Sequence, residues 1–176
     1  DHNSLESFKK IYTMLSKSGN EEALEKFFKE KHKDYLKNKK SRRSLNRFLL
    51  AMGDKRRARQ VSIKSIKEDR GDPDSLKAMA LICFQEGDHK NAILCCEKII
   101  SQNVYLEYAY NLLGIIYKKM NRLDDAIEHY RKGIEAEPES VKLHHNIAIA
   151  YALNREANKS KRALERSKKL KKLQGL

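Results

Sequence analysis

Apolar residues recur along this chain at the spacing of a helix. Near the N-terminus, Phe8, Ile11 and Leu15 lie three or four residues apart, and the same spacing returns in later segments. Residues three and four apart share one face of an α-helix. Only two prolines occur, Pro73 and Pro138, and proline is excluded from helix interiors because it lacks the N–H and clashes with the preceding turn. The pattern therefore predicts an all-α protein.

The helical pattern also repeats, and residues 107–140 hold its best-defined copy. An aromatic residue, a Leu-Gly pair and a second aromatic residue are followed there by an alanine, an aromatic residue, a glycine and a proline. These are Tyr110, Leu113, Gly114, Tyr117, Ala126, Tyr130, Gly133 and Pro138. Equivalent apolar and small residues stand one period earlier, in residues 73–106, and one period later, in residues 141–174.

The spacing of these residues resembles the tetratricopeptide repeat (TPR), which has a period of about 34 residues. Tyr110 takes the place of the usual Trp, and Gly133 takes that of the usual Ala. The resemblance implies a right-handed α-solenoid of antiparallel helix pairs, that is, a TPR-like superhelix. Because one repeat cannot bury its own apolar face, stacking of neighbours is expected to form the core.

The resemblance divides the chain into five segments. Residues 73–106 and 107–140 are predicted repeats, and residues 141–174 are a third that ends in a basic C-terminal capping helix. Residues 39–72 are predicted to be a degenerate TPR-like helix pair, because Arg42 and Asn46 fill places that normally pack. Residues 1–38 are expected to form an N-terminal helical hairpin, either a cap or a divergent repeat.

Small residues are expected where the two helices of a repeat approach most closely. They are Ala80, Gly114 and Ala148 on the first helices, and Ala92, Ala126 and Ser160 on the second helices. Glycine in mid-helix costs about 1 kcal/mol relative to alanine, so close packing is the natural explanation for Gly114. The turns within the repeats are expected at Gly87, Asn121 and Asn154, which tolerate the left-handed conformation at a helix C-terminus. Ser140 is predicted to cap the helix that follows it.

Charge is distributed unevenly over the 176 residues, which carry a net charge of +14. Residues 1–72 hold 20 Lys and Arg against 11 Asp and Glu, and residues 141–176 hold 10 against 2. The region between them has a small excess of acidic residues. Such asymmetry indicates an acidic partner, an anionic surface or well-solvated helix faces. The lysines of the last helix are read either as a solubilising cap or as a contact patch.

Two alternatives to protein binding follow from these features. Nucleic acid or an anionic surface could bind the basic ends, in particular Lys37-Asn38-Lys39-Lys40-Ser41-Arg42-Arg43 and Lys55-Arg56-Arg57. Few aromatic residues are interleaved with these basic residues for base stacking, so nucleic acid is the weaker expectation. Self-association is the other alternative, since the repeats could stack on a second copy through an end face.

No residue pattern in the chain predicts catalysis. We find no phosphate-binding glycine loop and no zinc-like spacing of Cys or His, so no cofactor and no metal are expected. Cys83 and Cys96 occupy apolar helix positions and are interpreted as small core side chains, while a redox role for the Cys95–Cys96 pair is the alternative. No apolar run approaches the roughly 20 residues that a spanning helix needs, and no signal peptide is recognisable. A cytoplasmic, non-enzymatic adaptor or scaffold is therefore predicted.

In the TPR family, the concave groove is lined mainly by the first helix of each repeat. Projecting that face onto this sequence gives a predicted partner-binding groove of Arg43, Arg47, Lys77, Leu81, Phe84, Tyr108, Asn111, Ile115, Lys118, Lys142, His145 and Ile149. Asparagine can bond a peptide backbone as both donor and acceptor, and Lys and Arg can hold carboxylates. The predicted ligand is therefore another protein or a peptide that carries acidic residues and one or two apolar anchors.

Overall fold

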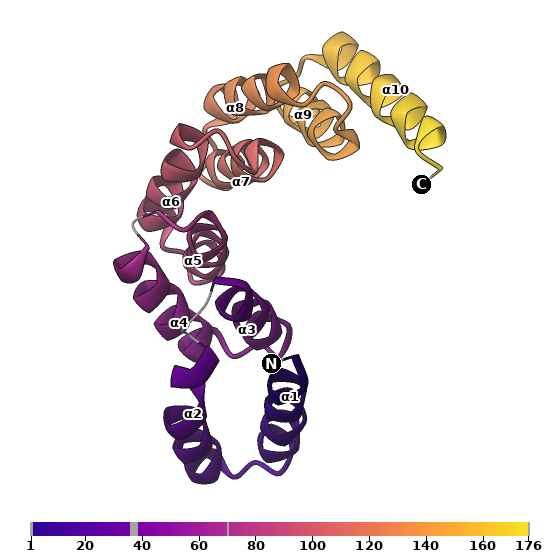
Figure 1. Ribbon diagram of the computed structural model, residues 1–176. Coiled ribbons are helices and arrows are strands. Elements are labelled where there is room, and N and C mark those ends of the chain that lie inside the picture. The colour runs from indigo at the N-terminus through magenta and orange to yellow at the C-terminus, as the bar shows by residue number, and fades with distance from the viewer. Residues whose placement is uncertain (1, 36–38, 70, 176) are drawn as a thin grey trace. The chain divides into compact units, whose positions relative to one another are not determined.

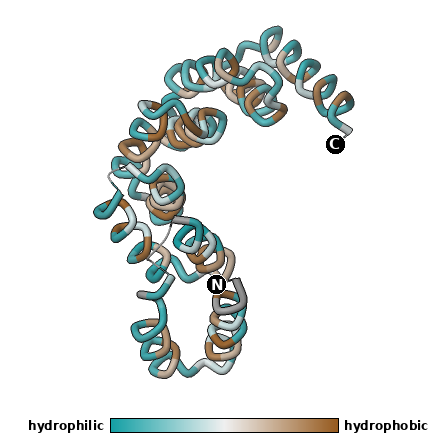
Figure 2. The backbone as a smooth tube through the Cα atoms, viewed as in Figure 1, coloured by the Kyte–Doolittle hydropathy of each residue, from teal (hydrophilic) through white to brown (hydrophobic). Residues whose placement is uncertain are grey.

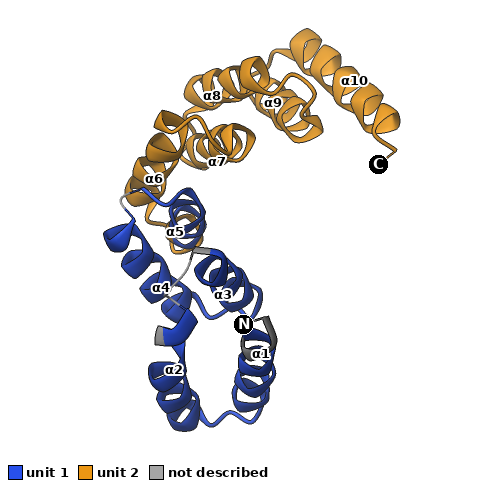
Figure 3. Cartoon of the chain, in the orientation of Figure 1, with its two compact units in different colours: residues 1–82 blue, residues 83–176 orange. Residues whose placement is uncertain are grey.

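The computed structural model describes residues 2–35, 39–69 and 71–175, and these form ten α-helices and no strand (Figure 1). In chain order they are α1 (His2–Lys17), α2 (Glu21–Tyr35), α3 (Lys39–Ala51), α4 (Lys55–Glu68), α5 (Pro73–Gln85), α6 (His89–Ser101), α7 (Leu106–Lys119), α8 (Leu123–Ala136), α9 (Val141–Leu153) and α10 (Ala157–Leu173). The predicted all-α fold class is confirmed. The chain consists of two compact units, and the boundary between them lies between residues 82 and 83, within α5 (Figure 3).

In unit 1, residues 1–82, one apolar cluster joins side chains of α1 to α5. Its buried members are Phe8, Tyr12, Leu24, Phe28, Leu45, Leu49, Ala58, Val61 and Ile82. The α3–α4 pair also buries a polar contact, since the Asn46 amide donates to Ser62 Oγ at 2.7 Å. Asn46 thus occupies a packing position, as the sequence indicates. The hydrogen bond offsets part of the cost of its burial, because its Oδ1 is buried without a partner among the described residues.

In unit 2, residues 83–176, the predicted close approach of α7 and α8 occurs at Gly114. A Cβ atom at this position would lie 2.3 Å from Tyr130 Cε1, because the Tyr130 ring rests on the Gly114 backbone. Tyr130 is fully buried with Ala126, Leu143 and Ile147 in the core of this unit. No larger residue fits between the two helices without moving that ring.

Of the three residues predicted to be left-handed in the turns within the repeats, two are confirmed and one is wrong. Gly87 has φ 81° and Asn121 has φ 59°, as expected at the ends of α5 and α7. At the end of α9, however, Asn154 has φ −83°, and the left-handed residue is Arg155, with φ 61°. The Asn154 amide instead donates to Asp124 Oδ1 at 3.1 Å and to Glu156 Oε1 at 2.9 Å. Side-chain hydrogen bonds therefore hold Asn154 in place, and the sequence motif could not show them.

Helix starts are stabilised by side chains that accept backbone hydrogen bonds. Ser140 Oγ accepts from the Leu143 N–H at 3.2 Å, which confirms the predicted cap of α9. Asp88 caps α6 in the same way through Asn91. Hydrophobic residues alternate with hydrophilic ones along the helices (Figure 2), and no helix within the described residues is long and apolar enough to span a bilayer.

Candidate functional site

The first helices of the second and third predicted repeats, α7 and α9, lie side by side in unit 2 and share one open face. On α7 this face carries Glu107, Asn111, Ile115 and Lys118, which are three or four residues apart and so follow one side of the helix. On α9 it carries Lys142, His145, Asn146 and Ile149. These eight residues are called the α7–α9 face below, and six of them belong to the predicted groove.

Two polar contacts cross from α7 to α9 on this face. Asn146 Nδ2 donates to Asn111 Oδ1 at 2.6 Å, and Lys142 Nζ lies 3.7 Å from Glu107 Oε1. The Lys142–Glu107 pair is exposed, with 76% of the Lys142 side chain and 41% of the Glu107 side chain accessible to solvent. Exposed ion pairs contribute about 0–1 kcal/mol, so a ligand can displace this one at little cost.

The contact within the asparagine pair leaves the amide nitrogen of Asn111 and the amide oxygen of Asn146 without a partner among the described residues. Each amide group can donate twice and accept through its oxygen, and the contact between the two uses Nδ2 of Asn146 and Oδ1 of Asn111. Nδ2 of Asn111 and Oδ1 of Asn146 have no further partner among the described residues. Both side chains are only partly buried. Together they offer a donor and an acceptor to the C=O and N–H of one residue in an extended peptide, which point to the same side.

Apolar side chains border the asparagine pair. Ile115 is half-buried and lies one turn beyond Asn111 on α7, while Ile149 is 36% exposed and lies almost one turn beyond Asn146 on α9. Lys118, which is half-buried, and His145, which is exposed, complete the polar edge. The α7–α9 face therefore combines amide groups for a backbone with apolar positions for side chains.

The sequence profile of the tetratricopeptide repeat matches residues 107–140, and a second profile of the same repeat matches residues 75–103. These matches coincide with the helix pair α7–α8 and with most of α5 and α6. These two segments of the chain are tetratricopeptide repeats.

The chain is also similar to one curated protein in sequence and to several solved structures in fold. The peroxisomal targeting signal receptor of Saccharomyces cerevisiae is 27% identical over 79 residues, which is 45% of this chain but only 13% of that receptor. The structure of MamA, from its residue 41 to the end, from Desulfovibrio magneticus RS-1 superposes with a TM-score of 0.71 at 19% identity, covering 97% of this chain and 96% of that solved chain. TTC0263, a TPR protein of Thermus thermophilus, gives 0.63 at 21% identity, covering 76% and 74%. At such identities the two structures establish a TPR solenoid fold.

The remaining predicted groove residues of the TPR chain are distributed over both units. In unit 1, Arg43 forms an ion pair with Asp74, Arg47 is exposed, and Lys77 and Leu81 are half-buried. Arg43 is thus already engaged with a carboxylate of its own chain. It is less available for an acidic ligand than the sequence suggests.

Phe84 and Tyr108, in unit 2, are both half-buried. The Lys119 ammonium lies 4.6 Å from the centre of the Phe84 ring, so this aromatic face is covered by a cation–π contact. Burial, with smaller contributions from Cys96 and Cys95, raises the pKa of the Tyr108 hydroxyl. A raised pKa of this origin indicates that the hydroxyl is largely enclosed.

The basic cluster Lys55-Arg56-Arg57 differs most from its sequence-based interpretation. Arg57 is a buried residue, only 2% exposed, and its guanidinium contacts Asp54 at 2.5 Å, Glu21 at 2.7 Å and Glu25 at 2.8 Å. Burial works against the charge of Arg57, but the hydrogen bonds to Asp54 and Glu21 raise its pKa. Glu21 and Glu25 come from α2, so local sequence could not reveal them, whereas Asp54 lies only three residues before Arg57.

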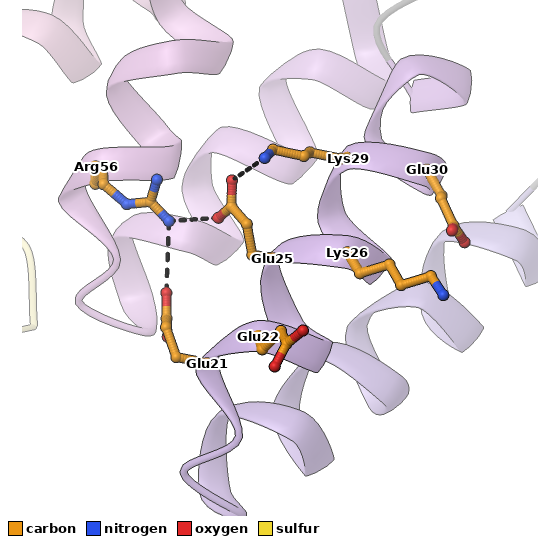
Figure 4. A pocket seen from close by; sticks show the side chains of 7 residues that line it. All are labelled: Glu21, Glu22, Glu25, Lys26, Lys29, Glu30 and Arg56. Atoms are coloured by element: carbon orange, nitrogen blue, oxygen red, sulfur yellow. Dashed lines mark hydrogen bonds and ion pairs between the residues drawn. The ribbon is translucent and has the colours of Figure 1, made fainter.

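A second arginine completes this network of unit 1 (Figure 4). Arg56 contacts Glu25 at 2.5 Å and Glu21 at 3.4 Å. The hydrogen bonds to Glu25, chiefly the one from Arg56, lower the pKa of Glu25 to about 2. The surrounding hollow has a volume of about 730 Å³ and is lined by Glu21, Glu22, Glu25, Lys26, Lys29, Glu30 and Arg56. Its opposite charges offset one another, so the hollow selects neither an anion nor a cation.

Ion pairing also weakens the nucleic-acid alternative at the first basic tract. Arg42 contacts Glu68 at 3.0 Å, and Arg43 is paired with Asp74. Lys37 and Asn38, together with the side chain of Lys39, lie outside the described residues. In both basic clusters of unit 1, the arginine charges are thus offset by carboxylates of the chain itself.

The described residues contain no group of three His, Cys, Asp or Glu side chains that could hold a metal ion. Cys83 and Cys96 are buried, as predicted for core side chains, and Cys95 is half-buried. Burial raises the pKa of the Cys96 thiol to about 12. A thiol with so high a pKa is a poor nucleophile near neutral pH.

Proposed function

We propose that the chain is a non-catalytic protein-interaction module that binds a peptide segment of a partner protein along the α7–α9 face. The observation that carries this proposal is the Asn111–Asn146 pair, with its uncommitted donor and acceptor next to Ile115 and Ile149. Such a surface offers hydrogen bonds to a backbone and apolar contacts to side chains, as peptide-binding faces do. The TPR fold and a relative named as a receptor are in keeping with binding rather than catalysis.

The chemistry of this face suggests the ligand. One residue of an extended ligand, whose C=O and N–H point to the same side of the strand, bonds Asn111 Nδ2 through its C=O and Asn146 Oδ1 through its N–H. An apolar side chain of the ligand packs between Ile115 and Ile149. An acidic side chain reaches Lys118, or replaces Glu107 as the partner of Lys142, whose present ion pair is long at 3.7 Å and exposed. The proposed partner is therefore a segment that combines an apolar anchor with an acidic residue.

The test is a selection from a random peptide library displayed on phage. Peptides retained by the wild-type chain are measured by calorimetry against the variant Asn111→Ala/Asn146→Ala/Ile149→Ser. Loss of two side-chain hydrogen bonds and one apolar contact is expected to weaken binding by about 2–3 kcal/mol, or roughly 30- to 150-fold.

The matched control is Asn91→Ala/Asn158→Ala/Leu94→Ser, which makes comparable changes at exposed positions of α6 and α10. This control is expected to bind the selected peptides within about threefold of the wild type. If both variants bind equally well, the peptides occupy another surface and the assignment of the α7–α9 face is wrong.

A further inference from the structure

The last helix, α10, carries a charge excess found in no other helix of unit 2. Between Ala157 and Leu173 stand eight basic residues and a single acidic one, Glu165. The basic residues are Lys159, Lys161, Arg162, Arg166, Lys168, Lys169, Lys171 and Lys172. All eight are exposed.

Among the described residues, only one of these eight charges is offset by an ion pair. Among the described residues, the one ion pair formed by these eight side chains joins Lys159 to Glu156. No carboxylate in that part of the chain pairs with the other seven. The basic clusters of unit 1 contrast with this, since Arg56 and Arg57 are held by Glu21 and Glu25. Among the described residues of unit 2, the densest group of basic side chains without an ion pair therefore lies on α10.

The helix is fixed in place, so it presents this charge as a surface. Leu170 and Ser167 are buried, and Ser167 Oγ donates to the carbonyl oxygen of Val141 at 3.1 Å. Just after the helix, Gln174 Nε2 donates to the carbonyl oxygen of Glu139 at 3.0 Å. Because its apolar side is docked on the chain, α10 cannot turn that side outward. Figure 2 shows the helix as mainly hydrophilic with isolated hydrophobic residues.

The spacing of the basic residues arranges them along the outer side of α10. Lys161, Lys168 and Lys172 are seven and four residues apart and therefore share one face. Lys169 lies beside this row, and Leu173, one turn after Lys169, is 71% exposed. The outer side thus combines a line of lysines with an uncovered leucine at its end.

We propose that this outer side of α10 binds the surface of a lipid bilayer that contains anionic lipids. Clusters of about four to eight Lys and Arg on a helix are suited to such a surface, and a bilayer also accommodates an exposed leucine at the level of its headgroups. A nucleic acid is favoured less, because α10 has no aromatic side chain for base stacking and a phosphate backbone makes no use of Leu173. Lysine, a point charge, needs no defined partner geometry.

This membrane contact lies on a different surface from the proposed peptide site and does not depend on it. The interaction is mainly electrostatic, so it is expected at moderate salt and is lost when salt screens the charges. Leu173 adds a smaller apolar contribution. No helix is required to cross the bilayer or to leave the fold.

The experiment is sedimentation of the chain with vesicles of phosphatidylcholine containing about 30 mol% phosphatidylserine, in about 0.1 M salt. The wild type is expected to bind these vesicles, to ignore vesicles of phosphatidylcholine alone, and to dissociate at about 0.5 M salt. The variant Lys161→Gln/Lys168→Gln/Lys169→Gln/Lys172→Gln is expected to lower the partition coefficient at least about tenfold. Leu173→Ser alone is expected to lower it about threefold.

The matched control removes the same number of charges elsewhere, in Lys10→Gln/Lys26→Gln/Lys67→Gln/Lys90→Gln. These lysines are also exposed. The control variant therefore has the same net charge as the α10 variant but keeps the lysines of α10, and its partition coefficient is expected within about twofold of that of the wild type. An equal loss in both variants would show that only overall charge matters and would overturn the proposal. Failure of the wild type to bind, or tighter binding to a short DNA duplex than to the vesicles, would also overturn it. Equal melting curves for the two variants are expected, since all the replaced side chains are exposed.

Discussion

Replacing Gly114 with alanine sets two physical effects against each other. Alanine is the better helix former by about 1 kcal/mol, so in an isolated helix the substitution would stabilise. Here, however, the new Cβ atom would lie 2.3, 2.4 and 2.7 Å from three carbons of the Tyr130 ring. Ordinary carbon–carbon contacts are about 3.5–4.0 Å, so the ring or the helix has to move by about 1 Å.

The surroundings of Tyr130 decide how much this movement costs. The ring is fully buried and belongs to one cluster with Ala126, Leu143 and Ile147, so it cannot shift without displacing neighbours. Overpacking of a well-packed core costs about 1–3 kcal/mol, and three short contacts place this case at the upper end. With the gain in helix propensity subtracted, we expect Gly114→Ala to lower the stability of unit 2 by about 2 kcal/mol. Gly114→Leu should lower it further.

The assay is urea unfolding followed by far-UV circular dichroism, in a double-mutant cycle with Tyr130→Leu. Once the ring is absent, Gly114→Ala should become stabilising by about 1 kcal/mol, because only helix propensity remains. Tyr130→Phe serves as the control, since the buried Tyr130 hydroxyl has no hydrogen-bond partner among the described residues and its removal should not lower stability. If Gly114→Ala stabilises the chain with Tyr130 in place, the proposed packing of α7 on α8 is refuted.

Two further predictions concern the charge network of unit 1. Arg57→Met leaves three carboxylates without their shared cation and should destabilise this unit by about 3 kcal/mol. This is the lower end of the range for a broken buried ion pair, because Glu21 is exposed to solvent. An unchanged urea midpoint would mean that the network does not stabilise the unit. The hydrogen bonds from Arg56 and Arg57 lower the pKa of Glu25 from 4.5 to about 2. The ionised Glu25 carboxylate therefore contributes fully to the stability of unit 1 at pH values well above 4.5, and this contribution is lost as the pH falls toward 2. Glu25→Gln should therefore flatten the loss of stability in this acidic range, and an acid-unfolding curve identical to that of the wild type would contradict the assignment.

Local features of the fold could be predicted from the sequence. Gly114 is the clearest case, since a glycine in mid-helix needs a reason and the repeat spacing supplies one. The cap of α9 by Ser140 followed from the same reasoning, because a cap depends on residues close together in the chain. Helix type and the small residues at close approaches are likewise encoded within one repeat.

Features that depend on distant residues could not be predicted. Arg57 looks like part of an exposed basic cluster until Glu21 and Glu25, 36 and 32 residues earlier, are placed against it. The contact between Asn111 and Asn146 joins two repeats, and the sequence alone identified only Asn111 as part of the site. In the turn between α9 and α10 the left-handed residue is Arg155 and not Asn154, because a hydrogen bond to Asp124 holds the Asn154 side chain.

The central claim is that a peptide lies across Asn111 and Asn146, and nuclear magnetic resonance tests it most directly. A peptide from the library selection would be titrated into the labelled chain while the side-chain amide signals of both asparagines are followed. We predict that these two signals move together with those of Ile115 and Ile149 and saturate at the calorimetric affinity. Unmoved asparagine signals, with changes confined to α8 or α10, would contradict the account.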